Sequence, residues 1–137
     1  MSPFPASRGN LSDPAVVSRA RTLAARQLTQ WGLEHLAEST ELIVSELFTN
    51  AIIHDKGDCN GDCSSDRTIG LRLIRHEMLT CEVSDASHSH PLVRHPRSTD
   101  EHGRGLFLVT QLSCRWGTRH IPDGKIIWAD QRLPAGA

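Results

Sequence analysis

An acid and an amide stand four residues apart in the stretch SELFTNAIIH, residues 45 to 54, as Glu46 and Asn50. In a helix this spacing places both side chains on one face, about one turn apart, and His54 continues the same stripe. Such a face could line a pocket, but on spacing alone a solvated polar face is the favoured interpretation. The opposite stripe of the helix is apolar and consists of Ile43, Leu47 and Ala51.

A third candidate is Asp85, which ends the strand-like run LTCEVSD at the mouth of a long loop. An ionised carboxylate accepts hydrogen bonds and donates none, so Asp85 could accept one from the exocyclic amine of adenine. Guanine carries an oxygen at that place, and two acceptors repel each other. Taken alone, an ordinary loop aspartate that hydrogen-bonds its own turn is the favoured interpretation.

Another candidate is the stretch HGRGLFLV, residues 102 to 109, which contains Gly103, Arg104 and Gly105. Two glycines at a helix start allow the backbone to approach a ligand closely. The free N–H groups and the helix dipole there favour an anion such as phosphate, and Arg104 adds a positive charge. A lone G-x-G pair is a weak signal, and a plain glycine loop is the alternative.

The elements that must position these residues follow from the hydrophobic periodicity. A helix with Ser12 or Asp13 as N-cap ends near Trp31, and two alternating runs joined at His76–Glu77 predict an antiparallel hairpin. Hairpin-joined strands with the helices in a separate group predict an α+β two-layer sandwich. The further helices are expected near 36–54 and 103–114, and the strands near 68–76, 78–85, 116–121 and 125–133.

Length and composition set limits on the function. A chain of 137 residues with 38% hydrophobic and 23% charged residues fits one globular domain. We expect a flexible arm over 1–12, the domain over 13–132 and a flexible tail over 133–137. The net charge of −1 lacks the basic footprint of a duplex DNA binder, so no direct contact with nucleic acid is expected.

The expected compartment is the cytoplasm. No apolar run approaches the roughly 20 residues of a membrane helix, and the N-terminus has no signal-peptide core. The four cysteines are therefore expected to be reduced thiols. His54, Cys59 and Cys63 lie close together, but a zinc site usually needs four ligands, so a polar loop is favoured.

Taken together, these signals are much more specific than any one of them. In this order, an E-x-x-x-N helix, an Asp at a strand end, a long loop and GRGL at a helix start resemble the GHKL superfamily of ATP-binding domains. The closest resemblance is to the anti-sigma-factor serine/threonine kinases and related stand-alone histidine-kinase-like ATPase domains. It spans roughly residues 13 to 132 and is carried by ELIVSELFTNAIIH, CEVSDAS, HGRGLFLVTQLSCRWG and GKIIWAD.

The resemblance implies a Bergerat fold, with a mixed, mostly antiparallel sheet, helices on one face, and ATP between the helices and the loop. It implies that Asn50 binds Mg²⁺ through its amide oxygen, a hard ligand of the kind that Mg²⁺ prefers. Glu46 would orient or deprotonate the nucleophile, which is water or a partner's serine hydroxyl. Asp85 would read adenine. The other positions assigned to the nucleotide are His54, Ser87, Gly103, Arg104, Gly105 and Leu106.

Two functions follow from the resemblance. In the first, the chain is a kinase that phosphorylates a small antagonist protein and binds a sigma factor. In the second, it is a non-catalytic nucleotide-binding or partner-binding regulatory module. The second is motivated by DASHS, residues 85 to 89, which stands where the family has D-x-G-x-G and so lacks both glycines. A homodimer is compatible with either function.

Overall fold

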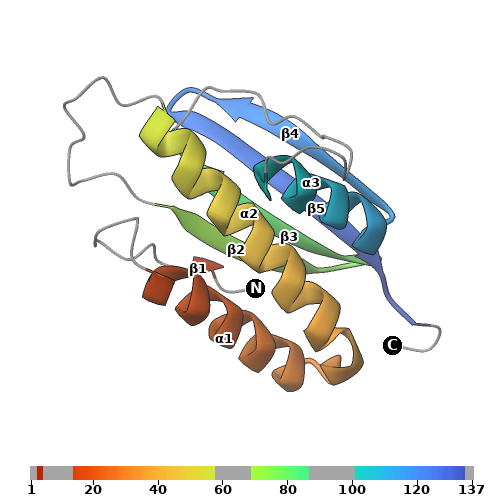
Figure 1. Ribbon diagram of the computed structural model, residues 1–137. Coiled ribbons are helices and arrows are strands. Elements are labelled where there is room, and N and C mark those ends of the chain that lie inside the picture. The colour runs from red at the N-terminus through yellow and green to blue at the C-terminus, as the bar shows by residue number, and fades with distance from the viewer. Residues whose placement is uncertain (1–2, 5–13, 58–68, 87–100, 135–137) are drawn as a thin grey trace.

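The computed structural model describes residues 3–4, 14–57, 69–86 and 101–134. These residues form one antiparallel sheet with strand order β1-β2-β3-β5-β4 and helices against it (Figure 1). The elements are β1 (Pro3–Phe4), α1 (Pro14–Gln30), the 3-10 turn η1 (Glu34–Leu36), α2 (Ala37–Gly57), β2 (Gly70–Arg75), β3 (Met78–Asp85), α3 (Glu101–Leu112), β4 (Arg115–Ile121) and β5 (Gly124–Arg132).

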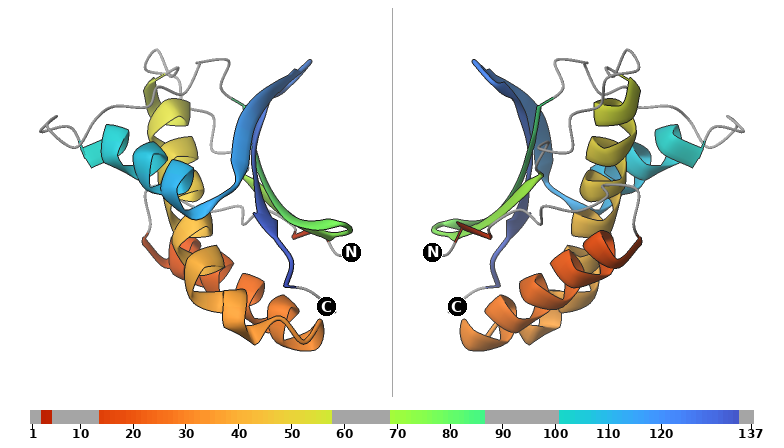
Figure 2. Two further views of the ribbon diagram at one scale, coloured as in Figure 1. Left: turned by 90° about the vertical axis from the view of Figure 1, so that its right-hand side faces the viewer. Right: turned by 90° about the vertical axis from the view of Figure 1, so that its left-hand side faces the viewer.

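The molecule has two layers, because α1, α2 and α3 all lie on the same side of the sheet (Figure 2). The predicted α+β two-layer sandwich with helices on one face is therefore confirmed. Each strand pair in the described residues is antiparallel, so the parallel pairing that a mixed sheet allows is not found among them. None of the described helices is long and apolar enough to cross a membrane.

The core lies between the two layers, where the predicted apolar stripes meet. In β3 the alternating residues Leu79, Cys81 and Val83 are at most 2% exposed, as the period-2 pattern predicts. The register sets Cys81 opposite Leu73 of β2, so that hydrophobic rows of neighbouring strands coincide. The predicted apolar stripe of α2 is fully buried against them and consists of Ile43, Leu47 and Ala51.

The end of α1 is set by a glycine cap. Gly32 has φ +72°, the left-handed conformation that closes many helices. The N–H of Leu33 donates to the carbonyl of Leu28 at 2.8 Å, and the N–H of Gly32 donates to that of Thr29 at 3.1 Å. Leu28 and Leu33 also pack in one hydrophobic cluster. This Schellman motif turns the chain back so that α2 can pack beside α1, and it confirms the predicted helix end.

One strand was not predicted. Within the segment expected to be an arm, Pro3 pairs with Arg72 and Phe4 with Leu71, at the free edge of β2. Edge strands expose backbone groups that another segment can pair with, and a two-residue strand has no periodicity for sequence reasoning to detect. At the other terminus, the residues from 135 onward lie outside the described ones.

Candidate functional site

The polar stripe of α2 is only partly in contact with water. Glu46 is half-buried, and Asn50, one turn later, is only 5% exposed. Asn50 is therefore not part of a solvated face, the interpretation that its spacing alone had favoured. Its Nδ2 atom is buried and has no hydrogen-bond partner among the described residues. Leaving a buried polar group unsatisfied costs about 1–3 kcal/mol, so this amide fits a ligand better than a purely structural role.

Glu46 has a perturbed acidity. Burial raises the pKa of its carboxyl above the ordinary value of 4.5, because desolvation disfavours the charged form. A general base works best when its pKa lies nearer to the working pH. The burial of Glu46 therefore moves the pKa of its carboxyl in the direction that the predicted catalytic role requires.

Asp85 is a buried carboxylate at the end of β3, not an exposed loop residue. It is 4% exposed and points to the helix side of the sheet, in the same row as Val83. Lys125 of β5 is its direct partner in the strand register, and Nζ of Lys125 lies 3.3 Å from Oδ1 of Asp85. The other carboxylate oxygen, Oδ2, is buried and accepts no hydrogen bond from a described residue.

Sequence reasoning missed Lys125, although the sequence contains a signal for it. Lys125 is fully buried and opens the inward-facing row of β5, followed by Ile127 and Ala129. A lysine in an apolar inward-facing row needs a charged or polar partner, because an isolated buried ammonium is strongly disfavoured. The alternation in GKIIWAD could therefore have identified Lys125 as a candidate site residue.

Gly124 holds the start of β5 against the end of β3. It has φ +153°, and a Cβ atom built on it would collide with the carbonyl oxygen of Asp85 and lie 2.8 Å from Cα of Ala86. Only a residue without a side chain permits this approach of the two backbones. Gly124 thus allows its neighbour Lys125 to sit beside Asp85.

The glycine motif lies within the first turns of α3, and the helix begins two residues before the predicted start at Gly103. Helix α3 begins at Glu101, so Gly103, Arg104 and Gly105 belong to its first turns and do not precede it. The N–H groups without intrahelical partners are then those of the first residues of α3, up to Arg104. Leu106 is 1% exposed and packs in the core, and its N–H lies where α3 uses such groups for its own hydrogen bonds.

Two other predicted residues are described less fully. His54 lies in the C-terminal part of α2. Ser87 lies outside the described residues, as do Cys59 and Cys63. Within the part of the chain that is described, no group of three His, Cys, Asp or Glu side chains could hold a metal ion.

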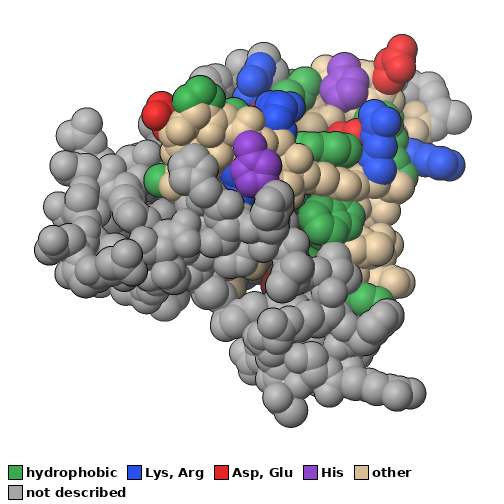
Figure 3. Space-filling model, turned by 90° about the horizontal axis from the view of Figure 1, so that it is seen from above, with side chains coloured by type: hydrophobic (Ala, Val, Ile, Leu, Met, Phe, Trp, Pro, Cys, Tyr) green, Lys and Arg blue, Asp and Glu red, His purple; other side chains and the backbone are tan. Residues whose placement is uncertain are grey.

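The candidate residues gather at one end of the molecule. The C-terminal part of α2, the end of β3 and the start of β5 lie toward the same end of the molecule (Figure 1). Viewed from above, the described part of the molecule shows Lys, Arg and His side chains together with acidic and hydrophobic ones (Figure 3). Asn50 is buried on α2, and Asp85 is buried in the row of β3 that faces the helices.

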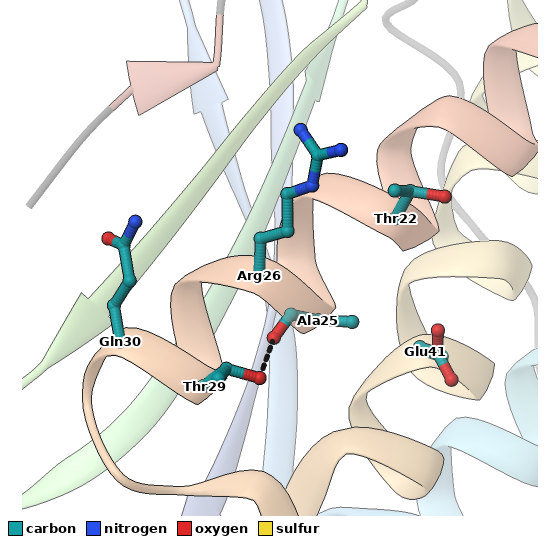
Figure 4. Close-up of a pocket in the computed structure, with 6 residues that line it drawn as sticks. All are labelled: Thr22, Ala25, Arg26, Thr29, Gln30 and Glu41. Atoms are coloured by element: carbon teal, nitrogen blue, oxygen red, sulfur yellow. Dashed lines mark hydrogen bonds between the residues drawn. The ribbon is translucent and has the colours of Figure 1, made fainter.

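A separate hollow of about 470 Å³ lies between α1 and α2 (Figure 4). Exposed or half-buried side chains line it, among them Arg26, Thr29 and Glu41. The hydroxyl of Thr29 donates to the carbonyl of Ala25 within the same helix at 3.1 Å, as is common for threonine on a helix surface. None of the predicted site residues lines this hollow, so we do not assign it the function.

Comparison with known proteins identifies the family. Residues 11–130 match the family model described as the histidine kinase-like ATPase domain. A search of curated proteins finds no match.

Proposed function

The chain belongs to the histidine kinase-like ATPase domain family, and on that premise we propose that it binds ATP between α2 and the adjoining ends of β3 and β5. Domains of this family bind ATP, generally with Mg²⁺, and act in regulation. The observation that carries the proposal is the buried amide of Asn50, whose Nδ2 has no described hydrogen-bond partner. Asp85, which ends β3, is likewise buried, at 4% exposure.

The two residues fit different parts of the ligand. Asp85 accepts a hydrogen bond from the adenine amine and disfavours guanine, which places an oxygen there. Asn50 offers a carboxamide that presents its oxygen to Mg²⁺ once the amide turns about its last bond. The phosphates then extend toward the first turns of α3, where free N–H groups favour anions.

The finer proposal is that the chain is a serine/threonine kinase of the anti-sigma-factor type. Glu46 orients the hydroxyl of a small antagonist protein and accepts its proton, while the hydroxyl oxygen bonds to the γ-phosphorus of ATP and ADP leaves. The raised pKa of Glu46 supports this role, because a more basic carboxylate accepts a proton more readily. The partners under this proposal are the antagonist and a sigma factor.

One observation favours a non-catalytic regulatory module instead. Gly103 and Gly105 lie inside α3, so they do not form an open glycine loop ahead of the helix. A site with this arrangement could bind a nucleotide or a partner without transferring phosphate. ATP binding is common to the kinase and to a nucleotide-binding module, and only phosphate transfer separates them.

Calorimetric titration of the full chain with Mg-ATP tests the nucleotide site. We expect saturable binding, and we expect Asn50→Ala to weaken the Mg²⁺-dependent affinity about tenfold or more, because it removes a metal ligand. Thr49→Ala is the matched control, since it changes the neighbouring position on α2. A folded wild-type chain that gives no heat with Mg-ATP would overturn the proposal.

Phosphate transfer is tested with a candidate antagonist protein whose gene lies next to the gene of this protein. We expect the wild type to transfer the γ-phosphate of ATP to a serine or threonine of the antagonist. Glu46→Gln keeps the shape of the side chain but cannot accept the proton, so transfer is lost while ATP affinity stays nearly unchanged. Binding of ATP without transfer to any such protein would favour the non-catalytic module.

A further inference from the structure

We propose that Lys125 and Gly124 are positioning residues that orient Asp85 and thereby determine which purine base the site accepts. This inference rests on the proposed function, because it takes Asp85 as the residue that meets the base. Under this proposal no group of β5 touches the nucleotide. Strand β5 nevertheless determines which atom of residue 85 contacts the base.

The ion pair between Lys125 and Asp85 is enclosed by protein. Both side chains are 0% exposed, and Nζ of Lys125 lies 3.3 Å from Oδ1 of Asp85. Desolvating two charges costs several kcal/mol per ion, so such a pair persists only where both charges are well placed. The surface pair of Arg119 and Glu82 differs, because the Arg119 side chain is 55% exposed.

The chemistry of the ammonium fixes the orientation of residue 85. A lysine ammonium has three donors and no acceptor, so the atom that faces Lys125 must be an oxygen. In the wild type this atom is Oδ1 of Asp85, and the base is left to meet Oδ2. The 6-amino group of adenine can donate to Oδ2, whereas a 6-oxo purine presents a second acceptor there.

Gly124 makes this arrangement sterically possible. A Cβ atom at position 124 would collide with the carbonyl oxygen of Asp85. The start of β5 can therefore approach the end of β3 this closely only if residue 124 is glycine. This close approach sets Lys125 directly opposite Asp85 in the strand register. The Gly124–Lys125 pair is therefore one structural unit acting on Asp85.

The decisive test compares ATP with inosine triphosphate, ITP. ITP replaces the 6-amino group by an oxygen, carries a proton on N1 that adenine lacks, and adds no bulk, so it reverses the donor and acceptor pattern at this edge of the base. In Asp85→Asn the amide oxygen must still face Lys125, which turns the amide N–H₂ toward the base. We expect this variant to reverse the preference and bind ITP about tenfold or more tightly than ATP, because an amide donor suits the 6-oxo group.

The double variant Asp85→Asn/Lys125→Met removes the orienting cation. Its amide can turn either way, so we expect the ATP and ITP affinities to lie within about threefold of each other. The double variant removes both charges and leaves no uncompensated buried ion, so it is expected to fold. Arg119→Met is the matched control, because it removes a cation from an ion pair on the other face of the sheet.

The outcomes of these titrations distinguish the orienting role of Lys125 from the proposed ATP site itself. A wild type that prefers ATP, a single variant that prefers ITP and a double variant without preference would support the inference. The inference would be overturned, while the ATP site stands, if the ratio of ATP affinity to ITP affinity were equal in the single and double variants. It would also be overturned if both variants bound neither nucleotide. A folded wild type that binds neither nucleotide would overturn the proposed function as well, and one that binds both equally would overturn this inference alone.

Discussion

Glu46 and Asn50 share one face of α2 but differ in their contact with water. Asn50 is 5% exposed, whereas Glu46 is half-buried and retains a carboxyl whose pKa is raised by burial. The positions of both residues could be predicted, because the i, i+4 spacing is a local property of a helix. Their burial could not be predicted, because it depends on how closely the sheet packs against α2.

Replacing Glu46 by Gln is expected to stabilise the folded chain near neutral pH. Burial raises the pKa of this carboxyl above 4.5, so the ionised form is less favourable in the folded than in the unfolded chain. The contribution of Glu46 to stability is therefore fully present below pH 4.5 and is lost as the pH rises through the folded pKa. Glu46→Gln avoids that loss, because the amide does not ionise.

Urea unfolding of both proteins from about pH 4 to about pH 8 measures this difference. The gap in the free energy of unfolding should be absent at the acidic end and should grow toward neutral pH. The exposed Glu38 of α2 provides the control variant Glu38→Gln. A Glu46→Gln protein that is less stable than wild type near neutral pH would contradict the explanation.

The pairing of β3 with β5 is the element-scale feature that builds the site. The two strands run antiparallel, so the end of β3 meets the start of β5, and Asp85 lies opposite Lys125. The strands themselves could be predicted from the alternation of apolar residues, but their side-by-side placement could not. An intervening helix and strand separate β3 from β5 along the chain, and no local pattern encodes which strands become neighbours.

Gly124→Ala and Gly32→Ala are expected to differ strongly in stability, although both glycines have positive φ. The Cβ at Gly124 would collide with the backbone of Asp85, so this variant should lose at least about 2 kcal/mol of stability and the nucleotide preference. The Cβ at Gly32 meets nothing within 4 Å, so that variant should lose only about 1 kcal/mol.

Thermal unfolding of the two alanine variants, together with ATP titration, checks this expectation. Gly32→Ala should bind ATP as the wild type does, because Gly32 caps α1 away from Asp85. Similar stability losses in the two variants would show that the backbone approach at Gly124 is not as restrictive as the structure indicates.

At the scale of the whole molecule, the described helices all cover one face of the sheet, and none of them lies on the other face (Figure 2). That other face carries ion pairs in which Arg72 and Arg119 approach Glu82 at 3.7 and 3.2 Å. It also has a hollow of about 350 Å³ beside Ile121 and Ile126. The site that we propose for ATP lies on the opposite face, between the layers, so ATP bound there would contact both layers at once.

Mg-ATP is therefore expected to stabilise the whole domain and not only one loop. A ligand that binds only the folded chain raises the free energy of unfolding by about 2.7 kcal/mol when present at one hundred times its Kd. Thermal unfolding at increasing Mg-ATP should show a single transition that moves upward, and Mg-ITP should move it less at equal concentration. A saturating ligand that leaves the transition unchanged would contradict binding between the layers.

The sequence by itself determined the α-helices, the strands β2 to β5, the two-layer class and the positions of Glu46, Asn50 and Asp85. These follow from local periodicity and motif spacing, which the chain carries whatever its tertiary contacts. The tertiary structure alone decided that the amide of Asn50 is buried and that Lys125 lies against Asp85, 40 residues away. Those facts depend on strand order and layer packing, and they arise only when distant segments come together around one core.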